Sequence, residues 1–389
     1  MLPTERNKVE NRHASPLVCR KWAKIFRSSE AAAALWTQLD VCLPPYPDFL
    51  NFPLDGLYRW ILLHGAHIRG LTLEINGVEG WSPAHALLGM LGPRLASLRI
   101  FSDNDDAPAY EPKSRCPWLA LVPNVRSLEL EGVTDMTIER ARLPRGLTHI
   151  ALNGCGQTGL HKIPKVLSLL PTLHSLSLQF MEPGSDLAGL SSLTNLHHLD
   201  LSHCSLREVP AELANLAHLS SLTLNNNEEL GGNENADHVS ALADLRSLAV
   251  LEMRDCGLKS IPIAVTELPN LKTLLLGYND FTGTTTAIIP PGPYLSSLQL
   301  LAMSDSMPDP TSVVDKLVKP LAAATALQTL RINRNWGLSL NTAVTAALIK
   351  GKPHFRKLEY SGDMVDDTNK LDVNKLKKIF PLVKFNVVD

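Results

Sequence analysis

The chain has 389 residues, 44% of them hydrophobic and 20% charged, and its formal net charge is −2. This composition is typical of a folded protein, and so small a charge gives no field to attract a phosphate backbone, so we expect no nucleic-acid partner. The first residues hold no apolar core of signal-peptide length, and no window approaches the roughly 20 apolar residues of a membrane-spanning helix. We therefore expect no membrane partner and a cytoplasmic or nuclear location.

Residues 1–41 are basic and carry apolar side chains at helical spacing. Val18, Trp22 and Phe26 recur with a helical period, and a second apolar cluster follows in Leu35-Trp-Thr-Gln-Leu-Asp-Val41. The pattern predicts a small helical segment.

Residues 42–67 form a proline-rich stretch followed by an amphipathic run. They begin with a stretch that holds four prolines, Pro44, Pro45, Pro47 and Pro53, which predicts a rigid linker. An amphipathic run from Leu54 to Leu63 then predicts a capping helix.

From residue 68 onward the chain repeats one phrase. In Leu196-His-His-Leu-Asp-Leu-Ser-His-Cys-Ser-Leu206 an apolar residue opens a short alternating run, and Leu219 opens the same phrase 23 residues later. This is the form L-x-x-L-x-L-x-x-N/C-x-L of the leucine-rich repeat. Twelve phrases open at Ile68, Leu95, Val125, Leu147, Leu173, Leu196, Leu219, Leu248, Leu271, Leu298, Leu327 and Phe355.

The repeats predict the fold class. We expect an α/β solenoid over residues 68–389, a leucine-rich-repeat horseshoe with a parallel concave β-sheet. Proline-containing repeats predict tight convex segments after Pro164, Pro210 and Pro262, whereas longer repeats leave room for full helices, as in 236–245 and 311–324. A helix over 371–380 and a strand over 382–388 are expected to cap the array.

Three cysteines fall at the turn of a repeat, eight residues after its first leucine. They are Cys155, Cys204 and Cys256, and asparagines take the same position in other repeats at Asn227, Asn279 and Asn335. A small thiol suits a buried turn as a weak hydrogen-bond donor. We therefore expect reduced thiols and an intracellular compartment.

The concave strand face is the predicted partner-binding surface. Side chains alternate along a strand, so positions 3, 5 and 7 of each phrase are expected to face outward. The mixture of polar, charged and aromatic groups suits recognition of a protein partner. The candidates are Arg99, Phe101, His149, His198, Asp200, Glu252, Arg254, Tyr278, Arg331 and Trp336.

No catalytic constellation is present in the sequence, and we expect neither an enzyme nor a cofactor. His198, His203 and Cys204 are of metal-ligand type, but the repeat places Cys204 in the turn and His198 on the strand, so no metal site is predicted. Glu129 and Glu131 share one face without a pocket to separate their pKa values, as an acid and base pair requires.

The N-terminal segment carries a family resemblance. Val18-Cys-Arg-Lys-Trp22, a short gap and Leu35 to Val41 resemble the C-terminal half of an F-box, and Leu2-Pro3 resembles its opening. Thr4 to His13 lack the leucine- and isoleucine-rich helix of that motif, so the F-box is partial.

The chain thus resembles F-box proteins that continue into leucine-rich repeats and serve as substrate receptors of SCF ubiquitin ligases. The resemblance implies docking to the SCF linker subunit and cullin, with an unknown substrate on the concave face. The docking residues that it implies are Leu2, Pro3, Val18, Cys19, Trp22, Leu35 and Trp36.

Two other interpretations stay open at this point. One is a stand-alone leucine-rich-repeat scaffold for signalling or for cytoskeletal or axonemal assembly, with residues 1–41 only capping the solenoid. The other is an inhibitor that grips an enzyme in the horseshoe. In each case we expect a monomer within a larger complex.

Overall fold

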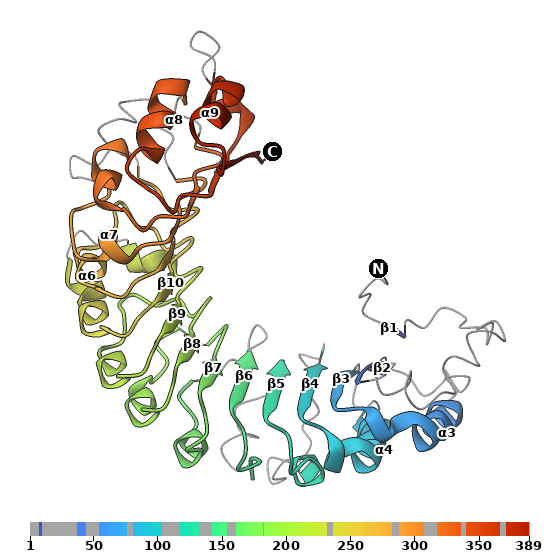
Figure 1. Cartoon of the computed structure of the whole chain (residues 1–389). Coiled ribbons are helices and arrows are strands. Elements are labelled where there is room, and N and C mark those ends of the chain that lie inside the picture. The colour runs from blue at the N-terminus through green and yellow to red at the C-terminus, as the bar shows by residue number, and fades with distance from the viewer. Residues whose placement is uncertain are drawn as a thin grey trace, which may run out of the picture. The chain divides into compact units, whose positions relative to one another are not determined.

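The computed structural model describes residues 8–9, 37–43, 54–75, 81–102, 117–131, 142–153, 161–181, 183–231, 236–281, 288–306, 317–335, 340–365 and 371–388. The chain divides into two units, Met1–Ser185 and Asp186–Asp389. In each unit short parallel strands alternate along the chain with short helices, and the helices lie on one side of the strands (Figure 1).

In unit 1 the strands pair in chain order, and every pair is parallel. The strands are β1 Lys8–Val9, β2 Gln38–Leu43, β3 Gly70–Ile75, β4 Ser97–Ser102, β5 Ser127–Glu131, β6 His149–Asn153 and β7 Ser175–Ser177. The α-helices are α3 Leu54–His64 and α4 Trp81–Leu91, and the 3₁₀ helices are η1 Gly65–His67, η3 Gly92–Arg94, η4 Pro117–Leu121 and η6 Lys165–Leu169.

In unit 2 the strands again pair in chain order and in parallel. The strands are β8 His198–Asp200, β9 Ser221–Thr223, β10 Val250–Glu252, β11 Thr273–Leu275, β12 Leu300–Ala302, β13 Thr329–Arg331, β14 Lys357–Tyr360 and β15 Lys384–Val387. The α-helices are α6 Ile263–Thr266, α7 Tyr294–Ser297, α8 Thr342–Ile349 and α9 Val373–Ile379. The 3₁₀ helices are η7 Ala188–Ser192, η8 Ala211–Asn215, η9 Glu228–Gly231, η10 Ala236–Asp244, η12 Pro320–Ala323 and η13 Gly362–Met364.

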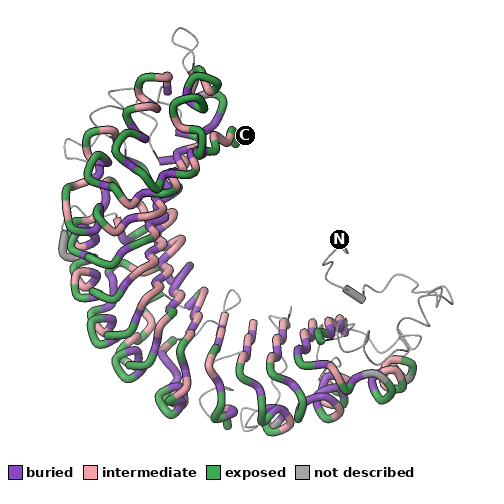
Figure 2. The backbone as a smooth tube through the Cα atoms, viewed as in Figure 1, coloured by how far each residue is buried: buried purple, intermediate pink, exposed green. Residues whose placement is uncertain are grey.

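The register of the strands follows the leucine phrase. Each of the twelve predicted phrases contains a strand that begins two residues after its opening apolar residue. The middle residues lie opposite one another, as Leu222, Leu251 and Leu274 do, and these three are 0% exposed. Burying one leucine contributes about 1.5–3 kcal/mol, so the row of leucines stabilises each unit along its length. The predicted leucine-rich-repeat fold with a parallel sheet is confirmed, and the strands alternate buried and half-buried residues in Figure 2.

The sheet begins earlier than the sequence predicts. We placed the first strand after Ile68 and assigned Leu39 to a helical segment, but β2 pairs with β3 along all of its six residues. Leu39, Val41 and Leu43 are buried at alternate positions, which is the period of a strand. Leu39 fits both a helical and a two-residue spacing in so short a window, and the unpaired edge of β3 decides in favour of the strand.

The remaining predictions for the N-terminal segment lie outside the described residues. This applies to all of the ligase-docking candidates, which are Leu2, Pro3, Val18, Cys19, Trp22, Leu35 and Trp36.

The helices opposite the strands take their form from a three-residue spacing of leucines. Leu213, Leu216 and Leu219 are buried at every third position, which matches the three residues per turn of a 3₁₀ helix. The backbone N–H groups of Leu216 and Leu219 each donate to the carbonyl three residues earlier, at 2.9 Å. The tight segments predicted after Pro164, Pro210 and Pro262 are η6, η8 and α6.

The same spacing corrects one prediction about the longer repeats. We expected a full helix over 236–245, but the segment is the 3₁₀ helix η10. The buried residues Val239 and Leu242 of η10 and Leu245 directly after it are again three apart, so the extra length of this repeat does not convert the segment to an α-helix. Residues 311–316 of the predicted helix over 311–324 lie outside the described residues, and η12 forms its end. The C-terminal helix and strand are confirmed as α9 and β15.

Buried polar side chains form a ladder through the turns of unit 2. We call Cys204, Asn227, Cys256, Asn279, Ser306 and Asn335 the turn ladder. The Asn279 side-chain oxygen accepts from the backbone N–H groups of Cys256 and Leu258, both at 3.0 Å, and its amide donates to the carbonyls of Met253 at 2.7 Å and Leu276 at 2.9 Å.

Asn227 and Asn335 make equivalent bonds, so each asparagine links its own turn to the preceding one. The predicted burial of Cys204 and Cys256 is confirmed and both are free thiols, whereas Cys155 lies outside the described residues.

Candidate protein-binding surface

The side of each sheet opposite the helices presents alternate strand residues, beginning with the first residue of each strand. We call this side the sheet face. Its side chains come from β4–β7 in unit 1 and from β8–β14 in unit 2, and the residues that follow each strand extend it. The pattern arises because the leucines of each strand point to the core and leave the neighbouring positions outward.

In unit 1 the sheet face holds a cation between an aromatic ring and a carboxylate. Arg99 and Glu129 are register partners on β4 and β5, and the Arg99 Nη2 to Glu129 Oε1 distance is 2.8 Å. The Arg99 Cζ lies 4.2 Å from the centroid of the Phe101 ring, within the range of a cation–π contact. His149 on β6 is exposed, with its Nδ1 2.7 Å from the Thr148 hydroxyl. Arg99, Phe101 and His149 thus lie on the face where the sequence places them.

In unit 2 several polar residues of the face are tied to neighbouring repeats. The Asn225 amide donates to Glu252 Oε2 at 3.2 Å, and the backbone N–H of Arg254 donates to the Asn225 side-chain oxygen at 2.8 Å. Lateral bonds of this kind fix the side chains of this face before a partner arrives, which reduces the entropy lost on binding.

His198 and Asp200 on β8 begin the unit 2 face, and Asp200 is less exposed than His198. His198 is exposed. Asp200, in contrast, accepts from the backbone N–H of Ser202 at 3.0 Å and from its hydroxyl at 2.6 Å. Ser202, two residues after Asp200, is buried, and the two side chains satisfy each other within the turn.

Near the C-terminal end, the unit 2 face holds a charged cluster. Arg331 on β13 and Glu359 on β14 are register partners, with Arg331 Nε 2.7 Å from Glu359 Oε2. Lys357 pairs with the other oxygen of the same carboxylate. Two cations on one carboxylate leave a net positive charge here. The predicted candidate Arg331 lies in this cluster.

Between these polar regions the unit 2 face is apolar, which the sequence analysis missed. Leu275 and Ala302 occupy outward positions on β11 and β12, are register partners, and are only 7% and 6% exposed. Val250 and Leu300 at other outward positions are half-buried. The signal was the unbroken Leu274-Leu275-Leu276 run, which departs from the alternation of the other strands.

Two exposed aromatic residues stand at the turn that follows the strand. Tyr278 is 57% exposed in unit 2, and Phe180, at the equivalent position of its own repeat in unit 1, is 44% exposed. Both have left-handed backbones, with φ of 61° for Tyr278 and 59° for Phe180. Asn226 and Asp255 take this conformation in other repeats, and asparagine and aspartate tolerate it better than aromatic residues do. Tyr278 is among the predicted binding residues and Phe180 is not, because spacing alone does not reveal the backbone conformation.

The remaining candidates are Trp336 and the histidine and cysteine residues considered as metal ligands. Trp336 lies outside the described residues. The Cys204 thiol contacts the Ser202 carbonyl at 3.3 Å, and the His197 ring stacks on His218 with centroids 5.9 Å apart. Within the described ranges, no group of three or more His, Cys, Asp or Glu side chains is placed to hold a metal ion. No described helix has the length and apolar character needed to cross a bilayer.

Comparison with known proteins gives limited likenesses. No family model matches the chain. The volume-regulated anion channel subunit LRRC8D of Homo sapiens is 30% identical over 128 residues, which make up 32% of this chain, and the Rattus norvegicus protein is 31% identical over 127 residues, or 31% of this chain. The chain spans only 14% of the length of each of these relatives.

Two solved structures are similar over most of the chain at low identity. A crystal structure of an internalin of Listeria monocytogenes has a TM-score of 0.43 and 17% identity, with 94% of this chain and 93% of that chain covered. A leucine-rich-repeat protein of Leptospira interrogans has a TM-score of 0.39 and 17% identity, with coverage of 94% and 98%. The strand register and the turn ladder of the chain itself therefore establish its leucine-rich-repeat fold.

Proposed function

We propose that the chain is a non-catalytic module that holds a protein partner on its sheet face. The observation that carries this proposal is Tyr278, a large aromatic residue that is exposed beside the face in a conformation unfavourable for it. The left-handed backbone recurs at this turn position in other repeats, where Asn226 and Asp255 occupy it, so Tyr278 is set apart by its exposed aromatic side chain, which costs on the order of 1 kcal/mol there. Aromatic residues also contribute most to protein interfaces, together with arginine.

The surroundings of Tyr278 support the same reading. The apolar positions Leu275 and Ala302 lie on β11 and β12, with Glu252 and Arg254 on one side along the sheet and Arg331 on the other. An apolar centre with a polar rim is the usual anatomy of a protein interface. Extended faces of repeat proteins commonly serve such binding.

The proposal is tested by Tyr278→Asn. Asparagine suits the left-handed backbone, so the free energy of unfolding should rise by up to about 1 kcal/mol, while loss of the ring should weaken partner capture. Full-length wild-type and variant proteins are compared by quantitative affinity purification from cells and by urea denaturation. Ile263→Asn, at a 68% exposed position in α6 on the helix side, is the matched control. Undiminished capture by Tyr278→Asn contradicts the proposal.

The finer proposal is that the module is a substrate adaptor of an SCF-type ubiquitin ligase. Its support is the resemblance of Val18 to Val41 to part of an F-box, joined to the repeats. The end of this segment is strand β2, which pairs with β3 and so attaches the segment directly to the sheet. The location would then be the cytoplasm or nucleus.

The adaptor role is tested with Trp22→Ala and Trp36→Ala together. We expect the full-length protein to co-purify with the SCF linker subunit and cullin, and the double variant to lose both while keeping partners of the sheet face. Tyr278→Asn should show the reverse pattern. If wild-type protein never captures the linker subunit, the adaptor proposal is wrong and the binding module remains.

The alternative is a stand-alone scaffold for signalling or for cytoskeletal or axonemal assembly. The absence of an isoleucine- and leucine-rich helix from Thr4 to His13 favours it. Deleting residues 1–30 discriminates, because the deletion removes β1 and leaves β2 in the sheet. Under the scaffold reading partner binding survives the deletion and no ligase subunit is lost.

A further inference from the structure

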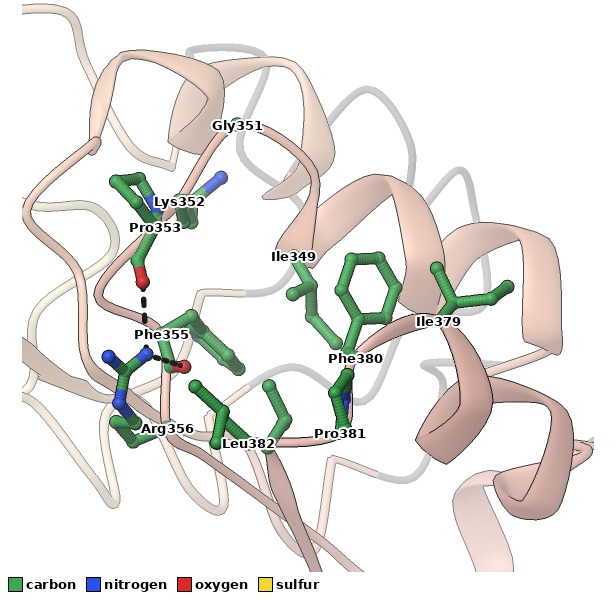
Figure 3. Close-up of a pocket in the computed structure, with 11 residues that line it drawn as sticks. Ile349, Gly351, Lys352, Pro353, Phe355, Arg356, Ile379, Phe380, Pro381 and Leu382 are labelled. Atoms are coloured by element: carbon green, nitrogen blue, oxygen red, sulfur yellow. Dashed lines mark hydrogen bonds between the residues drawn. The ribbon is translucent and has the colours of Figure 1, made fainter.

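The C-terminal end of unit 2 carries an apolar pocket that lies apart from the sheet face. Its volume is about 420 Å³, and its walls come from the segment that joins α8 to β14 and from the segment that joins α9 to β15. In Figure 3, Phe355 and Leu382 lie on one side of the opening and Ile349 and Phe380 on the other. Pockets of about 300–1,000 Å³ are large enough to bury ligand groups, so this one accommodates a bulky side chain.

The pocket has a buried floor and an unusually exposed apolar rim. Phe355, Ile349 and Val383 are 1%, 3% and 7% exposed, whereas Leu382 is 68% and Ile379 54% exposed. Exposed apolar side chains are common singly, but two at the mouth of an apolar pocket indicate an interaction site.

The position of Leu382 in the repeat strengthens this inference. The backbone N–H of Val383 donates to Phe380 O at 3.1 Å, as that of Phe355 donates to Lys352 O at 3.1 Å, so Val383 and Phe355 are equivalent core residues. The residue before the core position is small or polar in the twelve repeats that open from Ile68 to Phe355, as in Asn195 and His354. These residues are His67, Arg94, Asn124, Gly146, Thr172, Asn195, His218, Ser247, Asn270, Ser297, Ala326 and His354. Among the repeats from Ile68 onward only the last has a leucine there, so the repeat pattern does not account for Leu382.

The rim of the pocket is basic. Arg356 is exposed, and its Nη1 donates to the carbonyls of Pro353 at 3.0 Å and Phe355 at 2.8 Å. These bonds hold the guanidinium beside the opening (Figure 3). Its other N–H groups have no partner among the described residues. A fixed guanidinium with free donors is suited to a carboxylate. Further exposed cations are Lys350 directly after α8, Lys375, Lys377 and Lys378 on α9, and Lys384 on β15.

Few carboxylates oppose these cations. Among the side chains described from 349 to 388, Glu359 is paired with Arg331 and Lys357, and the Asp372 Oδ1 accepts from the backbone N–H of Lys375 at 2.8 Å as the cap of α9. Among the side chains that the structure describes at this end, the cations therefore outnumber the carboxylates. A second copy of the chain would bring the same cations to the contact and repel it, which excludes self-association as the best explanation.

We propose that this end of the chain binds an acidic peptide segment of a partner protein, with one bulky apolar residue seated in the pocket and flanking carboxylates on Arg356 and the exposed lysines of α9. Exposed lysines recur along α9 at Lys375, Lys377 and Lys378, which fits an extended segment better than a compact ligand. The proposal is independent of partner binding on the sheet face.

The test uses fluorescein-labelled peptides of the form Asp-Glu-Asp-X-Glu-Asp-Glu, in which X is Leu, Phe, Trp or Ser, and fluorescence anisotropy with the full-length chain. We expect at least one peptide with an apolar X to bind, and the Ser peptide to bind at least about tenfold more weakly, a difference of about 1.4 kcal/mol. Leu382→Ser and Arg356→Gln should each weaken the apolar peptide several-fold, and raising the salt concentration should weaken it further.

The matched control is Leu169→Ser, because Leu169 is 74% exposed in η6, far from the pocket in the sequence, and its variant should bind as wild type does. Tyr278→Asn should also leave peptide binding unchanged, which separates this proposal from binding on the sheet face.

Four results would overturn the proposal. They are the absence of binding by all three apolar peptides, equal binding of the Leu382→Ser variant, equal binding of peptides with Lys in place of Asp and Glu, and Leu382-dependent binding to vesicles of anionic phospholipid without binding to any peptide.

Discussion

At the scale of single residues, the turn ladder holds unit 2 together through a few side-chain amides. Asn279 satisfies two backbone N–H groups and two carbonyls that belong to consecutive repeats, and it is only 2% exposed. Buried backbone groups cannot turn to water when the amide is removed.

Asn279→Ala should therefore lower the free energy of unfolding by about 3–5 kcal/mol, because each buried group left without a partner costs about 1–3 kcal/mol. Urea denaturation of the full-length chain measures the change. Asn270→Ala is the matched control, since the exposed Asn270 amide makes a single bond to the Arg246 carbonyl at 2.9 Å and should change stability by less than about 1 kcal/mol. Similar losses for the two variants would show that the ladder is not the source of stability.

Cys256, a member of the ladder, makes stability depend on alkaline pH. Burial raises the pKa of the Cys256 thiol from its ordinary 9.0 to about 12; the nearby Asp255 carboxylate also raises it, whereas the hydrogen bond with Asn227 lowers it. Between about pH 9 and pH 12 the Cys256 thiol loses its proton in the unfolded chain and keeps it in the folded chain. The stability contribution is therefore complete below about pH 9 and is lost as the pH rises toward about 12. Burial raises the pKa of Tyr294 and Tyr360 as well, with the same sign.

Cys256→Ser should reduce this pH dependence without breaking the ladder. Ser306 holds the equivalent position, and its hydroxyl donates to the Leu276 carbonyl at 3.1 Å, as the Cys256 thiol does to Leu224 at 3.1 Å. The variant should resemble wild type near neutral pH and lose less stability between about pH 9 and pH 11, because the serine hydroxyl does not ionise there. Parallel slopes for variant and wild type would mean that Cys256 does not contribute to the alkaline transition.

At the scale of elements, the strands were predictable from the sequence because an opening apolar residue and a two-residue alternation mark each one. The strands of the twelve phrases begin two residues after that residue. The 3₁₀ form of η10 was not predicted. The full helix was expected because this repeat is long, whereas the three-residue spacing of Val239, Leu242 and Leu245 indicates a 3₁₀ helix. Strand β2 was missed because the edge of β3, and not the local pattern, selects its conformation.

The outward side chains were predictable to the same degree and for the same reason. Arg99, Arg254 and Arg331 follow from alternation alone. The buried Ser202, the apolar Leu275 and the left-handed Phe180 do not, because they depend on a side-chain bond, on packing across the sheet and on backbone conformation.

The assignment of β2 to the sheet is tested by Leu43→Ala. Leu43 is 0% exposed, and truncating a buried leucine costs about 2–5 kcal/mol of unfolding free energy. Leu62→Ala in α3 is the control, because Leu62 is 77% exposed and its truncation should be nearly neutral. Thermal and urea denaturation report both changes. A neutral Leu43→Ala variant would remove β2 from the stable part of the sheet.

At the scale of the whole molecule, the same repeat produces both the core and the surfaces. Leucines at fixed spacing satisfy the interior and leave the alternate positions of each strand free to vary, so the sheet face can carry a recognition pattern without disturbing the fold. In the last repeat the residue before the core position is Leu382 in place of a small or polar residue. This repeat therefore presents a second surface, which is apolar and basic.

The most direct test of the account is site-specific photo-crosslinking with p-benzoylphenylalanine in place of Tyr278, with the same group at Ile263 on the helix side as the control. If the sheet face holds the protein partner, position 278 should form a discrete covalent adduct in cells and position 263 should not. Adducts at 263 alone, or equal adducts at both positions, would contradict binding on the sheet face.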